Sequence, residues 1–258
     1  FMITMRVGKQ GIPLWFRWIE GKEKSESSCN DFLKEGITYV SNLFDSSYNL
    51  VFLADRWFSN TVLLEHIESL NHTYCIRLKK NIKVYCYDEN EGYNLWKFVG
   101  ELVPNKKSSK FLKDVYLTDK AYKTNIVISK SENVNEPWII VTNGSLKRAI
   151  KDYRYRFGSI ETLFKNPKNN GFYIESVVKA KLNYFISMYT LVCFSTLFLT
   201  ILGTDYSKNK SCYKTVKIIT HKYFIENGIR VKKRIMLLFN TGLTLFKYAF
   251  SSNKYIRI

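Results

Sequence analysis

Two carboxylates of the sequence occupy positions from which they could bind a metal ion. Asp55 directly follows residues 50–54, an apolar run whose length and β-branched and aromatic content favour a buried strand. α/β folds place ligand sites at the carboxyl end of such strands. Glu161 lies at the edge of the apolar stripe of a helix predicted over residues 145–164, so its side chain is expected to lean toward the sheet. Together they would suit Mg²⁺ or Mn²⁺, which prefer carboxylate oxygens.

Carboxylates of this kind are typical of phosphoryl transfer with two metal ions about 3.5–4 Å apart. One ion would activate an attacking water or 3′-hydroxyl, and the other would stabilise the leaving oxygen. Since two carboxylates are too few ligands for two ions, a third acidic ligand is expected. Each carboxylate also has an ordinary interpretation. Asp55 would cap the following helix or pair with Arg56, and Glu161 would join a surface salt bridge.

The pattern of apolar residues predicts a mixed α/β chain around these two positions. A hairpin opens it, with its turn at Gly8-Lys9-Gln10-Gly11, and the last part is mostly helical. The predicted strands cover residues 1–6, 12–17, 50–54, 73–78 and 137–142, and the predicted helices cover residues 31–44, 60–70, 145–164, 174–202 and 230–250.

The part between these core elements has a different character. Residues 80–136 contain short alternating runs separated by Asn, Asp, Gly, Lys and Ser, which predicts a β-rich insertion. We therefore expect residues 1–79 and 137–204 to form the catalytic core. Residues 205–258 would form a basic C-terminal helical region.

Charge is the first indication of a partner. The chain has 40 Lys and Arg against 22 Asp and Glu, a formal net charge of +18. Such an excess favours a polyanionic partner, most simply nucleic acid. Beyond residue 206, twelve basic residues accompany one acidic residue, Glu226, which suits a track for a phosphate backbone. The alternative is an ordinary basic protein from an AT-rich genome, which inflates Lys, Asn, Ile and Tyr.

Cysteine usage and hydropathy favour a cytoplasmic protein. The chain has five cysteines and three histidines, with no Cys-x-x-Cys pair, so neither zinc nor a disulfide framework is expected. No signal peptide is recognised. Residues 182–202 contain no charge and are long enough to span a bilayer. Because no second stretch of that length exists, we expect a buried core helix and no membrane.

Two segments carry a resemblance to a known family. Residues 51–58, Val-Phe-Leu-Ala-Asp-Arg-Trp-Phe, resemble the strand-Asp-Arg-Gly-Phe motif around the second catalytic Asp of DDE transposases of the IS4-like group. Residues 153–168 resemble the Tyr-Arg-Glu-Lys signature of that family. A β-rich insertion separates the two motifs there, as residues 80–136 would here. The similarity runs through nearly the whole chain.

The resemblance implies a fold and a function. The fold would be RNase H-like, a mixed sheet flanked by helices, with a β-rich insertion and a C-terminal helical region. The activity would be cut-and-paste DNA transposition in the bacterial cytoplasm, at the nucleoid. Asp55 and Glu161 match the second and third metal-binding carboxylates, and Tyr153, Arg156 and Lys168 match residues that contact transposon-end phosphates. Partners would be the terminal inverted repeats and target DNA, and pairing of two ends would favour a homodimer.

The sequence departs from the family pattern in three ways. Trp57 stands where Gly is usual, and four residues instead of three separate Arg156 from Glu161. A kink or π-bulge at Gly158-Ser159 would restore their alignment, whereas a regular helix through residue 158 would contradict this hypothesis. The family's first Asp has no counterpart, so we expect it upstream and expect this fragment to be inactive alone. A non-catalytic DNA-binding relic and a membrane-associated basic protein are the alternatives.

Overall fold

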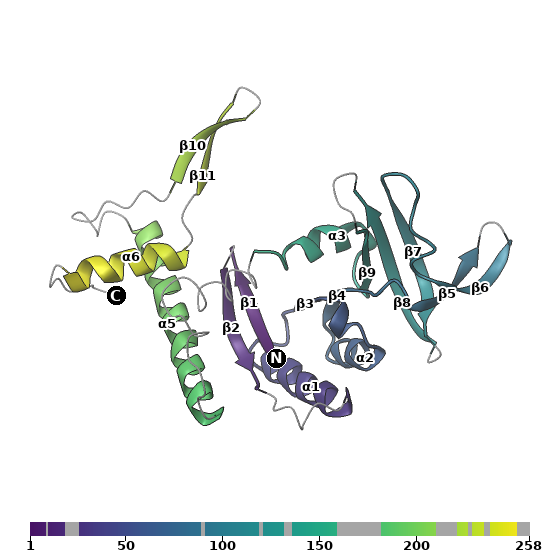
Figure 1. Cartoon of the computed structure of the whole chain (residues 1–258), viewed down its shortest axis with the longest axis horizontal. Coiled ribbons are helices and arrows are strands. Elements are labelled where there is room, and N and C mark those ends of the chain that lie inside the picture. Colours follow the sequence, from purple (N-terminus) through teal and green to yellow (C-terminus); the bar gives the residue numbers. More distant parts are fainter. Residues whose placement is uncertain are drawn as a thin grey trace. The chain divides into compact units, whose positions relative to one another are not determined.

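The computed structural model divides the chain into two compact units, which we describe separately (Figure 1). The first unit consists of Phe1 and Trp15–Phe157, and the second of Met2–Leu14 and Gly158–Ile258. The residues that the structure describes are 1–8, 10–18, 26–88, 91–118, 121–131, 136–158, 182–209, 221–226, 229–234 and 238–251.

A seven-stranded sheet forms the centre of the first unit, in the order β3-β4-β9-β8-β7-β5-β6. Strands β3 and β4 are parallel, and every other neighbouring pair is antiparallel. The strands are β3 (Val51–Ala54), β4 (Thr73–Arg77), β5 (Lys83–Asp88), β6 (Tyr93–Phe98), β7 (Ser108–Leu117), β8 (Tyr122–Lys130) and β9 (Trp138–Thr142). The predicted mixed α/β class is therefore confirmed.

Helices cover the sheet because its central strands are apolar on both faces. In β4, Tyr74, Cys75 and Ile76 are all buried, so alternate side chains need cover on opposite sides. Helix α3 (Leu146–Arg154) packs against β4, β8 and β9. Helix α2 (Thr61–Ser69) packs against β4 and against helix α1 (Glu26–Asn42). The core between α3 and the sheet consists of Cys75, Val127 and Ile140 of the sheet and Ala149 and Tyr153 of α3.

The strands of the predicted β-rich insertion are continuous with the core sheet. Strand β8 pairs with β9 over five residues, from Asn125 opposite Thr142 to Ser129 opposite Trp138. Strand β6 has no counterpart among the predicted elements. The predicted division has three parts: a core of residues 1–79 and 137–204, an insertion of residues 80–136, and a C-terminal region of residues 205–258. This division stays a prediction.

The second unit contains the opening hairpin and two helices. Strands β1 (Met2–Val7) and β2 (Gln10–Phe16) form a sheet of their own, and Gly8 in the turn has a φ of 63°. The last two residues of β2 belong to the first unit. The predicted hairpin is confirmed. Further along the chain come α5 (Leu182–Lys208), β10 (His221–Glu226), β11 (Ile229–Arg234) and α6 (Leu238–Ser251).

The predicted helix over residues 230–250 is wrong in its first part. Residues 229–234 form β11, which pairs antiparallel with β10, and helix α6 begins only at Leu238. The cause is visible in the sequence: Ile-Arg-Val alternates with period two, and Asn227-Gly228 precedes it. The helical spacing of the later apolar residues does not extend across this signal. The C-terminal region is thus helical only in part.

Helices α5 and α6 approach each other closely at two glycines. A Cβ atom on Gly203 would collide with the Leu238 carbonyl oxygen, and one on Gly242 would collide with the Leu199 carbonyl oxygen. Since backbone atoms cannot yield as a flexible side chain does, larger residues at either position must separate the helices.

We expect Gly203→Val to lower the melting temperature by about 5 °C, because overpacking costs roughly 1–3 kcal/mol. Thermal unfolding followed by circular dichroism would measure this. Leu191→Val is the matched control, since this α5 side chain is 67% exposed. Equal melting temperatures for the two variants would contradict the close helix contact.

Among the described residues, one helix, α5, is long and apolar enough to cross a membrane, judged by length and composition alone. Its surface is uneven: Leu191 and Phe194 are largely exposed, whereas Leu199 and Leu202 are buried. A core helix of a soluble protein meets the same criteria. The expectation that this helix does not enter a membrane stays a prediction.

Candidate functional site

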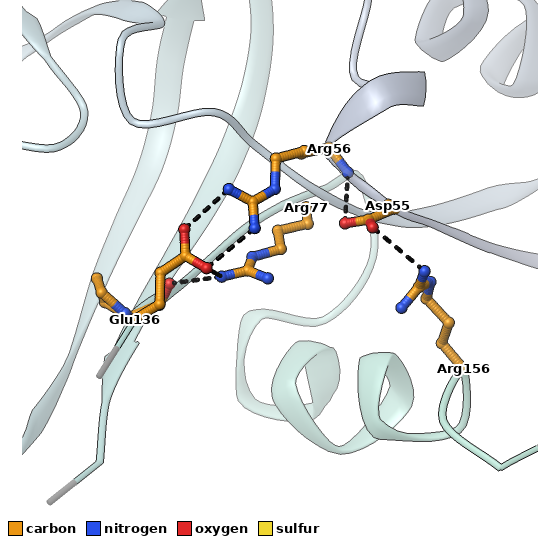
Figure 2. Close-up of polar contacts among 6 residues, drawn as sticks. Asp55, Arg56, Arg77, Glu136 and Arg156 are labelled. Atoms are coloured by element: carbon orange, nitrogen blue, oxygen red, sulfur yellow. Dashed lines mark hydrogen bonds and ion pairs between the residues drawn. The ribbon is translucent and has the colours of Figure 1, made fainter. Parts of the chain in front are cut away.

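Asp55 lies at the carboxyl end of β3, as the sequence predicts. The short 3₁₀ helix η2 (Arg56–Phe58) follows it, and the Arg56 backbone N–H donates to Asp55 Oδ1 at 2.8 Å (Figure 2). The capping interpretation of Asp55 is therefore confirmed. Its side chain remains 41% exposed, so the cap leaves the second carboxylate oxygen accessible to a further partner.

That second oxygen faces Arg156. The Arg156 Nη2 group donates to Asp55 Oδ2 at 3.3 Å, across 101 residues of sequence (Figure 2). The contact exists because α3 ends at Arg154 and the chain turns away, with Gly158 at a φ of 84°. The predicted continuous helix over residues 145–164 is therefore wrong. The hypothesis of a kink near Gly158 required that no regular helix pass through residue 158. The structure meets this requirement, since α3 ends before that residue.

A second ion-pair group lies beside the first. Arg56 Nη1 and Nη2 donate to the two oxygens of Glu136 at 2.8 and 2.9 Å, and Arg77 Nη2 lies 2.8 Å from Glu136 Oε2 (Figure 2). The hydrogen bonds from Arg56, followed by the charge of Arg77, hold the pKa of Glu136 below its usual value. Glu136 is consequently ionised at neutral pH. The Arg77 side chain is only 13% exposed, so its charge depends on this partner.

Tyr153 lies beneath these charges. It is fully buried and its ring meets Trp138 and Phe157 edge-on, with centroids 5.4 and 5.8 Å apart. Its hydroxyl is buried and finds no hydrogen-bond partner among the described residues. Burial raises the pKa of Tyr153, whereas the nearby Arg156 charge opposes that shift. A buried hydroxyl without a partner is costly, so it can gain from an added ligand atom.

We call the five charged residues Asp55, Arg56, Arg77, Glu136 and Arg156 the arginine cluster. Three guanidinium groups against two carboxylates leave a net charge of 3 − 2 = +1. Guanidinium forks bind planar or tetrahedral oxyanions with two donors each. The cluster is therefore suited to an anionic group that can compete with, or replace, one of its carboxylates.

The structure brings together three of the five predicted site residues. Asp55 and Arg156 are in contact, and Tyr153 lies close enough for both charges to affect its pKa. Glu161 and Lys168 lie outside the described residues. In the described part of the chain, no group of three or more His, Cys, Asp or Glu side chains could hold a metal. Of the carboxylates predicted to bind Mg²⁺ or Mn²⁺, the described residues contain Asp55 alone. The metal site itself stays a prediction.

Sequence reasoning missed Arg77 and Glu136 and gave Arg56 no role in binding. Arg77 had a signal, because it is the one charged residue at the end of the apolar run 73–78. Such a residue in a buried strand needs a partner. Glu136 had no comparable signal, since it precedes Pro137 in a polar stretch. Its pairing with Arg56 joins positions 80 residues apart.

No protein-family model matches this chain, and no curated protein matches it. The function must therefore be argued from the arginine cluster and from the sequence motifs.

Proposed function

We propose that this chain is the catalytic region of a DDE-type transposase with an RNase H-like fold, acting on transposon-end DNA. The contact between Asp55 and Arg156 is the observation that carries the proposal. It joins the two quoted motifs in space, although they lie in different parts of the sequence. A strand-end carboxylate beside a guanidinium group provides one ligand for a cation and one for a phosphate.

In this proposal each residue has a stated role. Asp55 and Glu161, with the further Asp that the resemblance implies, would hold Mg²⁺ or Mn²⁺, which would activate water and stabilise the leaving oxygen. Arg156 leaves Asp55 to bind a phosphate oxygen of the DNA, and Arg77 contributes a second donor group. The Tyr153 hydroxyl is fully buried, so it donates to the same phosphate only after the side chains that cover it move aside. Lys168 adds a further positive charge, by resemblance alone. A homodimer would bring two DNA ends together.

One observation favours a second function, that of a non-catalytic DNA-binding protein. Both oxygens of Asp55 already accept hydrogen bonds, from the Arg56 N–H and from Arg156. A carboxylate held in this way has a structural role that needs no metal. Both candidate functions require DNA binding at the arginine cluster, and only the first requires a metal ion at Asp55.

DNA binding through the cluster is tested by Arg156→Ala. We expect affinity for duplex DNA to fall about fivefold. The slope of log affinity against log salt concentration should also fall by roughly one, because one fewer counterion is released on binding. Fluorescence anisotropy at several salt concentrations measures both quantities. The matched control is Arg148→Ala, which removes the same charge from α3, where the side chain is 71% exposed. Equal losses in the two variants would show that charge alone matters and would refute a phosphate site.

A metal at Asp55 is tested separately by Mn²⁺ binding, followed by electron paramagnetic resonance. We expect Asp55→Asn to weaken Mn²⁺ binding by about tenfold, because a neutral amide is a poorer ligand than a carboxylate. The control is Asp45→Asn, which changes an exposed loop carboxylate that accepts a hydrogen bond from the Ser47 backbone N–H. Unchanged Mn²⁺ binding in Asp55→Asn would favour the non-catalytic protein.

A further inference from the structure

A second surface of the first unit carries a set of aromatic rings, most of which are exposed. We define the aromatic face as the side chains of Tyr85, Tyr87, Trp96, Phe98 and Tyr116, on strands β5, β6 and β7. In Figure 1 these strands lie at the opposite edge of the sheet from β3. The arginine cluster includes none of these residues.

Strand register places these rings on one side of the sheet. Tyr85 is directly opposite Trp96 in β6 and Tyr116 in β7, and Lys83 is opposite Phe98. Side chains of directly paired residues project from the same face. The ring centroids of Tyr85 and Trp96 are 5.4 Å apart, and those of Tyr85 and Tyr116 are 6.5 Å apart. The rings therefore form a continuous row across three strands.

The fold does not need these rings for its core. The alternate residues Val84, Cys86 and Leu117 project from the opposite face and are all at least 95% buried. On the aromatic face, by contrast, Tyr87 is 61% exposed and Trp96 43% exposed. Aromatic side chains exposed in a contiguous patch are a feature of binding surfaces.

Charge beside the aromatic face is mostly positive, although one carboxylate, that of Glu101, accepts from the Phe98 backbone N–H at 3.3 Å. The Lys83 ammonium lies 5.7 Å from the centroid of the Phe98 ring. The nearby carboxylate of Asp114 is neutralised by Lys123, at 3.1 Å, and by Lys113, at 3.8 Å. Rings interleaved with lysines fit an occupant that has flat π-faces and negative charges along its backbone.

We propose that the aromatic face binds single-stranded nucleic acid by stacking unpaired bases on its rings, while the lysines contact the phosphates. Aromatic side chains on an open sheet surface stack bases with little sequence preference, and backbone charge adds a salt-dependent contribution. Duplex DNA is excluded because its bases are already stacked. This inference does not rest on metal chemistry at Asp55, since the face shares no residue with that site.

The experiment uses the full chain and a fluorescein-labelled oligothymidylate of about a dozen nucleotides at low salt. We expect Trp96→Ala and Trp96→Leu to weaken binding similarly, by roughly fivefold or more, since each stacked base contributes about that much. Should the Trp96 variants unfold, Tyr87→Ala gives a second test, because the Tyr87 side chain is more exposed than that of Trp96. The matched control is Tyr48→Ala, a loop residue with the same 61% exposure as Tyr87. Circular dichroism confirms folding.

Three outcomes would overturn the proposal. Binding that survives in Trp96→Leu and fails in Trp96→Ala would show that apolar contact matters and base stacking does not. A dimer that dissociates on Trp96→Ala, seen by sedimentation, would assign the face to a second copy of the chain. Loss of oligothymidylate binding in Arg156→Ala but not in Trp96→Ala would assign binding to the arginine cluster. In that last case the proposed function would stand, and only the proposal that the aromatic face binds nucleic acid would be wrong.

Discussion

Under the proposed function, Asp55→Asn is expected to lower Mg²⁺-dependent DNA cleavage by about a thousandfold or more, in a form of the protein that contains all three carboxylates of the proposed metal site. A metal ion stabilises transition-state charge by several kcal/mol, and each 1.36 kcal/mol corresponds to about tenfold in rate. The fold should persist. Asn caps helix N-termini as well as Asp does, so its side-chain oxygen can still accept from the Arg56 N–H.

Single-turnover cleavage of a labelled DNA end, with Mg²⁺ and with EDTA, measures this effect. Asp45→Asn serves as the control, because Asp45 also accepts a backbone hydrogen bond, from the Ser47 N–H at 2.9 Å. Cleavage should be unchanged in that variant. Equal cleavage by Asp55→Asn and the unmodified protein would refute the metal-binding role. Absence of cleavage in both, with DNA binding intact, would favour the non-catalytic alternative.

Local signals in the sequence were sufficient to position Asp55. The apolar run before it predicts a strand, and strand β3 covers residues 51–54 as expected. The helix after it was predicted over residues 60–70 and spans Thr61–Ser69, beginning where Asn60 accepts from the Leu63 N–H. Strand propensity and helix capping act over a few residues, so a single sequence contains them.

The arginine cluster could not be predicted in the same way. Arg77 and Glu136 meet only because β4 and β9 are adjacent in the sheet, which depends on how all seven strands pair. The end of α3 was missed for a different reason. The apolar spacing continues to Phe157, but Phe157 instead stacks on Trp138, with centroids 5.4 Å apart, after the helix has ended. Periodicity alone does not distinguish these two kinds of packing.

The resemblance implies that Arg156 and Tyr153 contact an anion, and this stays a prediction. Both residues lie near Arg56 and Arg77. What the resemblance did not indicate is the carboxylate already bound to two of these arginines. Glu136 uses three hydrogen-bonding contacts that a phosphate would need. Under the proposed function, the strength of DNA binding would therefore depend on Glu136 as well as on the arginines.

Glu136→Gln is accordingly expected to increase affinity for duplex DNA by about tenfold. Hydrogen bonds between charged groups contribute roughly 1.5–3 kcal/mol, reduced here by the partial exposure of the pair. Since the arginines hold the pKa of Glu136 below its usual value, the carboxylate competes in its charged form at neutral pH and below. Replacing it with a neutral amide frees the Arg56 and Arg77 guanidinium groups for phosphate. Fluorescence anisotropy with one duplex, across a range of salt, measures the change.

The control must remove the same charge elsewhere. Glu35→Gln does so, because Glu35 pairs with Arg17 at 2.7 Å and is also partly exposed, at 57%. A general electrostatic effect would raise affinity equally in the two variants, whereas competition for the cluster raises it only in Glu136→Gln. The opposite result is equally informative. If Glu136→Gln instead weakens binding, Glu136 orients the arginines for the phosphate, and its carboxylate is required with the DNA bound.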